Sequence, residues 1–483
     1  MTKALESLNE IVWGAPALLL ILGVGLYLSL RTGFVQITCF PRAVRSFLEK
    51  LRPVEAKSGA VSPFQALCTA LAATVGTGNL AGVAGAIAIG GPGAVFWMWV
   101  CAIFGMVIKF AEATLAVRYR TRDANGEYVG GPMYMIQNGL GKRWTWLAGV
   151  YSFFGIVAAF GVGNATQINA VVSGINEAVT AFGGRPSLAG DLIMGILLAV
   201  LVTFMLLGGL RRIGAIAERL VPFAALGYIL LGLGVLIARM DAIPAALCAI
   251  FRGAFSPEAV TGGAIGTLFL TLRTGVARGV FTNEAGMGTA SIAHAAADVR
   301  HPAEQGLMGI MEVFLDTVVI CTVTALVILC SGVDIPYGVD VGVVLTTQAF
   351  SSVYGSWISV FIALALCLFA LATVLGWGLY GIRCAQYLFG TGVWRKFVFL
   401  QAAAVVAGAV LRTGTVWLLS ETVNGLMAIP NLIALIALTP ELCRLLQKNP
   451  SGGNYEYFHQ CQPLRAVPHA EIPSPCGGGQ ESR

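Results

Sequence analysis

The chain has 483 residues, of which 57% are hydrophobic and 11% charged, and its mean hydropathy is +0.79. A soluble domain usually has about 25% charged residues, so the composition excludes an ordinary water-soluble protein and predicts an all-α polytopic membrane protein. The formal net charge of +6 does not indicate a nucleic-acid partner, because in a membrane protein the position of Lys and Arg carries the information.

Hydropathy along the chain predicts about eleven transmembrane helices. Their expected ranges are 11–31, 66–90, 92–117, 144–175, 188–208, 213–238, 262–293, 305–331, 356–380, 395–411 and 422–440. Beyond the last span, residues 448–483 are polar and contain many Pro and Gly residues. That composition is typical of a disordered tail.

The second apolar segment is interrupted near its middle. Val75-Gly76-Thr77-Gly78-Asn79 places glycines and polar side chains where a plain spanning helix would be apolar. Irregular backbone is tolerated inside a membrane only where it is buried in protein or lines a cavity. The stretch therefore predicts a broken helix whose free backbone groups face a binding site. Close packing between helices is the alternative, because small residues also allow it.

The seventh segment has a similar interruption. The stretch from Leu272 to Ala297 contains several glycines together with Arg278, Asn283 and Glu284. When the first span is set aside, ten spans remain in two sets of five, and each set opens with an interrupted segment. Paired interruptions in corresponding positions indicate an inverted-repeat transporter. The predicted repeats cover 63–240 and 241–447, after an extra helix and a basic loop in 1–62.

Lys and Arg are concentrated in alternate loops. One side holds clusters such as the one that runs from Arg31 to Lys57, whereas the other side has only isolated basic residues: Lys3, Arg185, Arg239, Arg252 and Arg412. The protein is expected in the cell (inner) membrane. Because basic loops stay on the cytoplasmic side, the asymmetry predicts that the N-terminus lies outside the cell and the C-terminus in the cytoplasm. This arrangement requires an odd number of spans.

Both interrupted segments resemble the alanine/glycine:cation symporter family, also called the sodium:alanine symporters. The similarity is carried by TVGTGNLAGVAGAIAIGGPGAVFWMW from Thr74 and by RGVFTNEAGMG from Arg278. The stretches KFAEATLAVRYR, GGPMYMI and DTVVICTVTALVIL add to it. The resemblance covers roughly residues 10–447. It implies a leucine-transporter-type 5+5 inverted repeat preceded by one extra helix, and symport of small neutral amino acids with sodium.

The first interruption supplies candidates for holding the substrate. Thr77, Gly78 and Asn79 would offer backbone N–H groups and a side-chain amide to a carboxylate. By resemblance, Gln167 on the fourth span faces the substrate, and Asn164 is expected on the same face because it lies three residues earlier in a helix. The alternative for this last pair is hydrogen bonding between helices without any contact to substrate.

The second interruption and the ninth span supply the rest of the predicted substrate site. Phe281 and Trp377 would wall the substrate's small side chain, although both could be ordinary core aromatics. Thr282 and Asn283 complete the set. The family usually has Ser at the position of Thr282, and Ser-Ala-Pro where this chain has Thr289-Ala290-Ser291.

Sodium prefers oxygen ligands, and Thr74, Gly76 and Thr373 are the predicted metal ligands for it. The alternative for each Thr is a hydrogen bond to its own helix. The family usually has Ser directly before this Thr, where the chain has Ala372, and often Glu at the position of Ile382. The loss of a hydroxyl at Ala372 puts the choice of cation in question.

Charged residues inside spans need partners. Lys109 and Glu112 are three residues apart, which predicts an ion pair near the cytoplasmic end of the third span. Asp316 lies deeper, in the eighth span, and is expected to pair with Arg278 or Arg273. Glu284 has two interpretations, a substrate or proton group and a structural hydrogen bond, and His294 is expected to end the seventh span at the cytoplasmic face.

The favoured function is that of a secondary transporter that imports alanine, glycine or serine with sodium by alternating access. Proton coupling is the alternative. An ion channel is less favoured because no selectivity-ring segment is visible, and an enzyme is disfavoured because the four His are scattered. No cofactor is expected apart from the coupling ion, and the sequence leaves the oligomeric state open.

Overall fold

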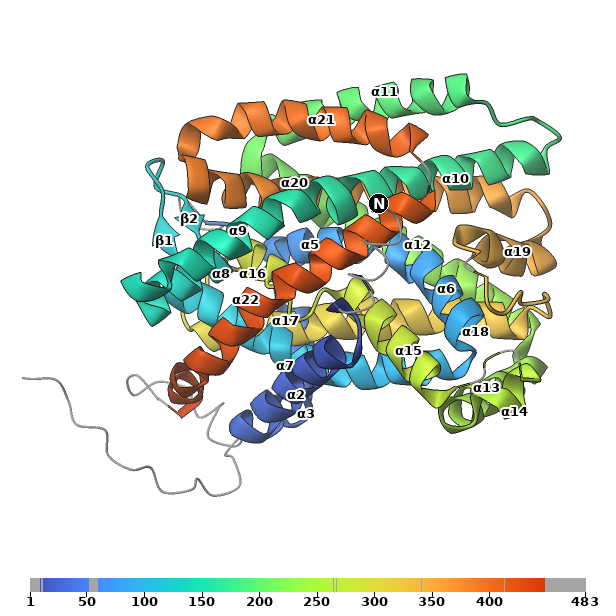
Figure 1. Ribbon diagram of the computed structural model, residues 1–483, viewed down its shortest axis with the longest axis horizontal. Coiled ribbons are helices and arrows are strands. Elements are labelled where there is room, and N and C mark those ends of the chain that lie inside the picture. Colours follow the sequence, from blue (N-terminus) through green and yellow to red (C-terminus); the bar gives the residue numbers. More distant parts are fainter. Residues whose placement is uncertain are drawn as a thin grey trace, which may run out of the picture.

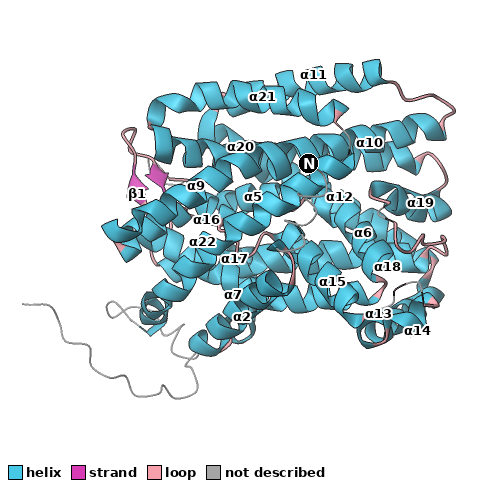
Figure 2. Cartoon of the chain, in the orientation of Figure 1, coloured by secondary structure: helices cyan, strands magenta, loops and turns pink. Residues whose placement is uncertain are grey.

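The computed structural model describes residues 9, 12–51, 60–263, 265, 267–339, 341–411 and 413–447. Most of these residues are helical, and the only strands among them form one two-stranded hairpin (Figure 2). The predicted tail, 448–483, lies outside the described residues, as does part of the predicted segment 1–62.

The helices follow one another along the whole described chain. They are α2 (Ala15–Thr32), α3 (Val35–Thr38), α4 (Phe40–Lys50), α5 (Pro63–Thr74), α6 (Ala81–Gly90), α7 (Gly93–Tyr119), α8 (Pro132–Met135), α9 (Thr145–Phe160), α10 (Thr166–Ala181), α11 (Leu188–Leu206), α12 (Gly209–Ala238), α13 (Ile243–Phe255), α14 (Pro257–Thr261), α15 (Leu268–Asn283), α16 (Thr289–His294), α17 (Pro302–Val313), α18 (Thr322–Cys330), α19 (Val343–Tyr354), α20 (Ile358–Phe389), α21 (Trp394–Val410) and α22 (Thr413–Gln447).

Shorter elements join or interrupt these helices. The 3-10 turns are η1 (Thr77–Asn79), η3 (Lys142–Trp144), η5 (Met240–Ala242) and η7 (Thr391–Val393), and the π-helical segments are η2 (Ile136–Leu140), η4 (Gly161–Ala165) and η6 (Phe314–Cys321). The hairpin pairs β1 (Thr121–Arg122) with β2 (Tyr128–Val129) in antiparallel register.

The first predicted break is present. α5 and α6 are bent by 59° at η1, and Gly76, which precedes this turn, has an extended backbone. The side chain of Asn79 accepts a hydrogen bond of 2.9 Å from the backbone N–H of Gly76, so the turn closes on itself. Backbone groups released from the helix are thus partly satisfied locally, as irregular structure at membrane depth requires.

The second predicted break is present as well. α15 ends at Asn283, and three of the next five residues have left-handed backbone: Glu284 (φ 54°), Gly286 (φ 92°) and Gly288 (φ 76°). Glycine adopts such values without steric cost, whereas other residues rarely do. The two glycines therefore explain why the helix stops here, before α16 begins at Thr289.

Most of the predicted spans match observed helices. Among the described residues, eight helices are long and apolar enough to cross a membrane, or nine when the bent pair α5–α6 is counted as one span. α2 is apolar but shorter, and the α15–α16 pair is the interrupted seventh segment. The count of eleven and the inverted repeat stay predictions. α13, α14 and α19 were missed because short helices fall below the length that hydropathy windows detect.

The helices surround a core that contains both breaks (Figure 1). α11 and α21 pack along one edge, while α7 packs against both α15 and α17 in the interior. The β1–β2 hairpin lies at one end of the bundle, and α13, α14 and α19 lie at the opposite end (Figure 1). Arg383 on α20 holds the hairpin through ion pairs with Asp123 at 3.4 Å and Glu127 at 3.1 Å.

Candidate functional site

The two breaks meet in the interior. A methyl group placed on Gly78 would lie 3.0 Å from Cγ2 of Thr282 and 3.4 Å from Cδ1 of Phe281, so the side chains of the second break pack directly against the backbone of the first. Every predicted substrate and sodium residue is buried. Because residues of both breaks touch, a ligand held at one break would also contact the other.

Gln167 lies at the first break. Its Oε1 accepts a hydrogen bond of 3.0 Å from the Thr77 hydroxyl and a longer one of 3.4 Å from the Thr77 backbone N–H. Its Nε2 donates to the carbonyl oxygen of Val162 at 3.1 Å. The amide is therefore held from both ends and links α10 to the turn that interrupts the second span.

Thr373 faces the same turn from α20. A methyl group on Gly76 would lie 2.6 Å from Oγ1 of Thr373, so the hydroxyl oxygen lies directly beside the Gly76 backbone. Thr373 donates its proton to the carbonyl of Phe369 at 3.0 Å, and Thr74 donates to that of Ala70 at 3.3 Å. These bonds to each residue's own helix use the proton and leave oxygen lone pairs for a cation.

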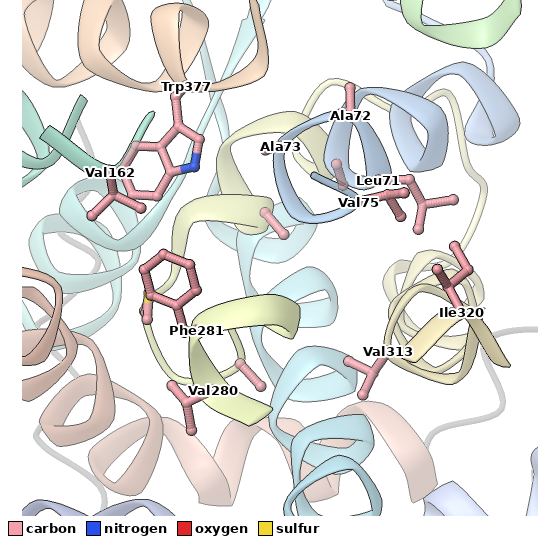
Figure 3. Close-up of a cluster of buried hydrophobic side chains, with 14 of the residues drawn as sticks. Leu71, Ala72, Ala73, Val75, Val162, Val280, Phe281, Val313, Ile320 and Trp377 are labelled. Carbon is pink, nitrogen blue, oxygen red and sulfur yellow. The ribbon is translucent and has the colours of Figure 1, made fainter. Parts of the chain in front are cut away.

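Trp377 and Phe281 lie on the same side of the broken second span, from α20 and α15 (Figure 3). Trp377 is completely buried, and its indole N–H donates to Oε1 of Glu284 at 2.7 Å. Oε2 of Glu284 accepts from the hydroxyl of Thr289 at 2.6 Å. The carboxyl group of Glu284 therefore makes the structural hydrogen bonds that one of its two interpretations predicts, and it fixes the orientation of the indole.

Asn164 does not face the first break. Its amide nitrogen donates to the carbonyl oxygen of Gln401 on α21 at 3.0 Å and to the side-chain oxygen of the same residue. The expectation that Asn164 and Gln167 share a face is wrong, because Asn164 lies in the π-helical segment η4, where the wider turn changes the angular spacing. Asn164 has the geometry of a side chain that joins helices.

Thr282 and Asn283 shape the second break. The Thr282 hydroxyl donates to the Gly279 carbonyl at 2.9 Å, which leaves its methyl group toward the first break. Asn283 accepts from the backbone N–H of Ala285 at 3.0 Å and donates to Thr317 at 3.2 Å. Thr282 therefore bonds within its own helix, while Asn283 joins the second break to the eighth span.

Asp316 joins the first break to the eighth span. Its Oδ1 accepts from Nδ2 of Asn79 at 2.7 Å, and its Oδ2 accepts from the Thr317 hydroxyl at 2.9 Å. The predicted ion pair with Arg278 or Arg273 is wrong, since the carboxylate is directed into the protein toward amide and hydroxyl donors. The bond to Asn79 adds an acidic group to the site that sequence spacing could not place.

Lys109 and Glu112 do not pair with each other, so that prediction is also wrong. Lys109 donates to Oε1 of Glu312 on α17 at 2.9 Å, and both side chains are completely buried. Oε2 of Glu312 lies 2.9 Å from Nε2 of His294, whose other ring nitrogen lies 2.7 Å from Gln305. His294 does end α16 as predicted, but as a buried member of this network.

Glu112 holds the second break. Its Oε1 accepts from the backbone N–H groups of Gly286 and Gly288, each at 3.0 Å, and from Nδ2 of Asn431 on α22 at 2.7 Å. Successive N–H groups in such a turn form an anion-binding concavity. The sequence did not indicate this role, because the glycines lie far from Glu112 along the chain.

A statistical description of the sodium:alanine symporter family matches residues 1–457. The chain belongs to the sodium:alanine symporter family. It is 44% identical over 441 residues to the sodium/alanine symporter AgcS of Methanococcus maripaludis, covering 90% of this chain and 94% of that one. It is 43% identical over 438 residues to an uncharacterized transporter of Haemophilus influenzae, covering 90% and 93%.

Membership of the sodium:alanine symporter family confirms the resemblance seen in the sequence and makes the chain a cation-coupled amino-acid symporter rather than an enzyme. The fold also resembles the transporter MhsT, whose structure was solved in complex with L-phenylalanine, with a TM-score of 0.56 at 14% identity over 79% of this chain and 90% of that one. At this identity the likeness concerns the fold alone, which is the predicted leucine-transporter type.

Proposed function

We propose that this symporter imports alanine, glycine and serine, driven by sodium. The observation that carries the proposal is the meeting of the two breaks at Gly78 and Thr282, with Gln167 and Thr373 directed at the same turn. The N-terminus of α6 points at this turn, and helix N-termini favour a carboxylate. Small and tightly packed surroundings favour a small substrate.

The proposed sodium ligands are oxygens of Thr74, Gly76 and Thr373, which come from the first break and from α20. Proton coupling is the second candidate, because Glu284 and Asp316 place a buried carboxyl group beside each break. The two candidates differ in what a mutation at Thr373 does, since only a sodium site needs its hydroxyl.

Uptake of labelled alanine into proteoliposomes that contain only this protein tests the function. An inward sodium gradient should drive accumulation, and collapse of that gradient by a sodium ionophore should abolish it. A proton gradient in sodium-free buffer serves as the control. Accumulation driven by protons alone would replace sodium by proton in the proposal, and a lack of accumulation in both conditions would overturn it.

At the proposed sodium site, Ala372→Ser should lower the sodium concentration needed for half-maximal uptake, because it restores the hydroxyl that the family pattern usually has there. Thr373→Ala should abolish sodium dependence or uptake, since one of few oxygen ligands is removed. Sodium titrations of alanine uptake at constant ionic strength measure both effects. A Thr373→Ala protein that titrates like the parent would move the ion away from α20.

For specificity, Trp377→Ala should admit leucine, because it removes the indole wall beside Phe281. The ratio of leucine to alanine uptake should rise by about tenfold or more, in line with the discrimination that pocket size usually gives. Trp377→Phe is the matched control, since it keeps an aromatic wall and loses only the bond to Glu284. Unchanged selectivity in folded Trp377→Ala protein would make Trp377 an ordinary core residue.

We also propose that the protein lies in the cell (inner) membrane with its β1–β2 hairpin and C-terminus in the cytoplasm. The distribution of basic residues supports this orientation, since Arg118, Arg120 and Arg122 lie at or beside the hairpin. The end formed by α13, α14 and α19 would then face outward. Substrate would enter from that end and leave toward the hairpin.

A further inference from the structure

A cavity lies beside the proposed central site, with Phe281 in its lining. It has a volume of about 200 Å³ and is lined from α15 by one helical face that includes Arg273, Thr274, Arg278 and Phe281, while Asn9 and Trp13 of the N-terminal segment form another wall. Ligand pockets of drug-sized molecules usually measure roughly 300–1,000 Å³, so this cavity suits a small ligand.

Among the described residues that line this cavity, the charge is one-sided: they include two arginines and no acidic residue. Within the described part of the chain, Arg273 has neither an ion-pair nor a hydrogen-bond partner. Arginine inside a spanning segment is costly and usually marks a functional site. A guanidinium group has five N–H donors in a planar fork, so each arginine can bind a carboxylate bidentately and still keep another contact.

Phe281 separates this cavity from the central site. Its ring lines the cavity and also approaches the position of Gly78 at the first break. Arg278 precedes Phe281 by about one helical turn and Arg273 by about two. α15 begins near α13 and α14, at the end of the bundle opposite the hairpin (Figure 1). A ligand in the cavity is therefore one aromatic ring away from the proposed substrate site, on its outward side.

The wall formed by Asn9 and Trp13 is held in place by contacts with α22. Asn9 donates from Nδ2 to the hydroxyl of Thr422 on α22 at 3.1 Å, which leaves its amide oxygen as an acceptor. Trp13 is buried and packs at the position of Gly425 on the same helix. An amide oxygen and an indole ring both suit an ammonium group, so this wall complements the other end of an amino acid.

We propose that this cavity is an outer binding site that holds a small amino acid before it passes Phe281. Arg273 and Arg278 bind its carboxylate, while Asn9 and Trp13 face its ammonium group. The proposal rests on the proposed function, and it gives the segment before α2 a role in substrate capture. Because substrate reaches this site before the central one, loss of the site should raise the substrate concentration needed for half-maximal uptake and leave the maximal rate of uptake unaffected.

Alanine uptake by Arg273→Gln and Arg278→Gln variants tests the outer site. At saturating sodium, each variant should raise the KM for alanine by about tenfold, the effect of losing one good charged hydrogen bond, with an unchanged maximal rate. Arg273→Lys and Arg278→Lys should recover part of the difference. Arg252→Gln, at an exposed arginine of α13 outside the cavity, is the matched control and should behave like the parent.

Propionate, which is alanine without its amino group, tests the carboxylate end of this cavity without transport. Binding of propionate to the full purified chain, followed by saturation-transfer NMR, should be equal for the parent and the Arg252→Gln control and weaker in the Arg273→Gln/Arg278→Gln double variant, in which only the central site can still hold a carboxylate. This measurement does not depend on transport, so it tests the cavity even if alanine proves not to be the substrate. Equal propionate binding in parent and double variant, or an unchanged KM in both single variants, would overturn the outer site. A loss of maximal rate at unchanged KM would overturn it too.

Discussion

Lys109→Met is expected to destabilise the protein by about 3–5 kcal/mol, the usual cost of leaving one member of a buried ion pair without its partner. Lys109 and Glu312 are completely buried and 2.9 Å apart. Removal of the ammonium group leaves the Glu312 carboxylate facing only the His294 ring. Thermal unfolding of the purified protein in detergent, followed by intrinsic fluorescence, measures the loss.

Two variants make this measurement specific. Lys109→Met combined with Glu312→Gln should recover a large part of the lost stability, because no uncompensated charge is left. Lys50→Met is the matched control: Lys50 lies 3.8 Å from Glu304 and both side chains are partly exposed, so its loss should cost only about 0–1 kcal/mol. Equal destabilisation in the single and double variants would contradict the ion-pair interpretation.

Gly163→Ala is expected to abolish uptake while leaving the membrane insertion of the chain intact. A methyl group on Gly163 would lie 2.2 Å from Cβ and 2.3 Å from Cγ of Trp377, which no rotation of the indole relieves because Cβ belongs to the tryptophan stem. The whole side chain must shift, and with it the bond from Trp377 to Glu284. Overpacking of this kind usually lowers the free energy of unfolding by about 1–3 kcal/mol. Here the displaced side chain is Trp377, which lines the proposed substrate site.

Gly149→Ala provides the comparison. Gly149 lies in α9, in the same span, and a methyl group there would meet nothing closer than Cδ2 of Leu388 at 3.9 Å. Uptake by this variant should match the parent. Gly163→Ala combined with Trp377→Ala should regain stability, since the clashing stem is removed. Uptake by Gly163→Ala at the parental rate would show that Trp377 can move without consequence for transport.

The breaks could be predicted because their signal is local. Gly76, Gly78 and Asn79 are neighbours in the chain, and glycines beside polar residues in an apolar run are unfavourable unless the helix ends there. The same holds for Gly286 and Gly288, whose left-handed backbone requires glycine. Both breaks and the residues within them were therefore accessible to sequence reasoning, and the family resemblance added Gln167 and Trp377.

The partners of the buried charges could not be predicted in this way. A spacing of three residues shows only that Lys109 and Glu112 lie near one another on a helix. It does not reveal that Glu312, 203 residues away, lies closer to the ammonium group. The prediction that Asn164 shares a face with Gln167 was wrong for a different reason. A π-helical turn changes which residues share a face, and it has no clear sequence signature. The short helices α13 and α19 were missed because they do not span the bilayer.

The bonds of Glu112 have a consequence for how the chain is made. Its partners Gly286 and Asn431 follow it by 174 and 319 residues, and Glu312 follows Lys109 by 203. While the ribosome is still translating the second half of the chain, α7 has none of these partners. Within α7, Lys109 and Glu112 are the only oppositely charged residues that lie within one helical turn of each other. We expect α7 to enter the bilayer with the two compensating each other, and to exchange that provisional pair for the final ones as α16, α17 and α22 arrive.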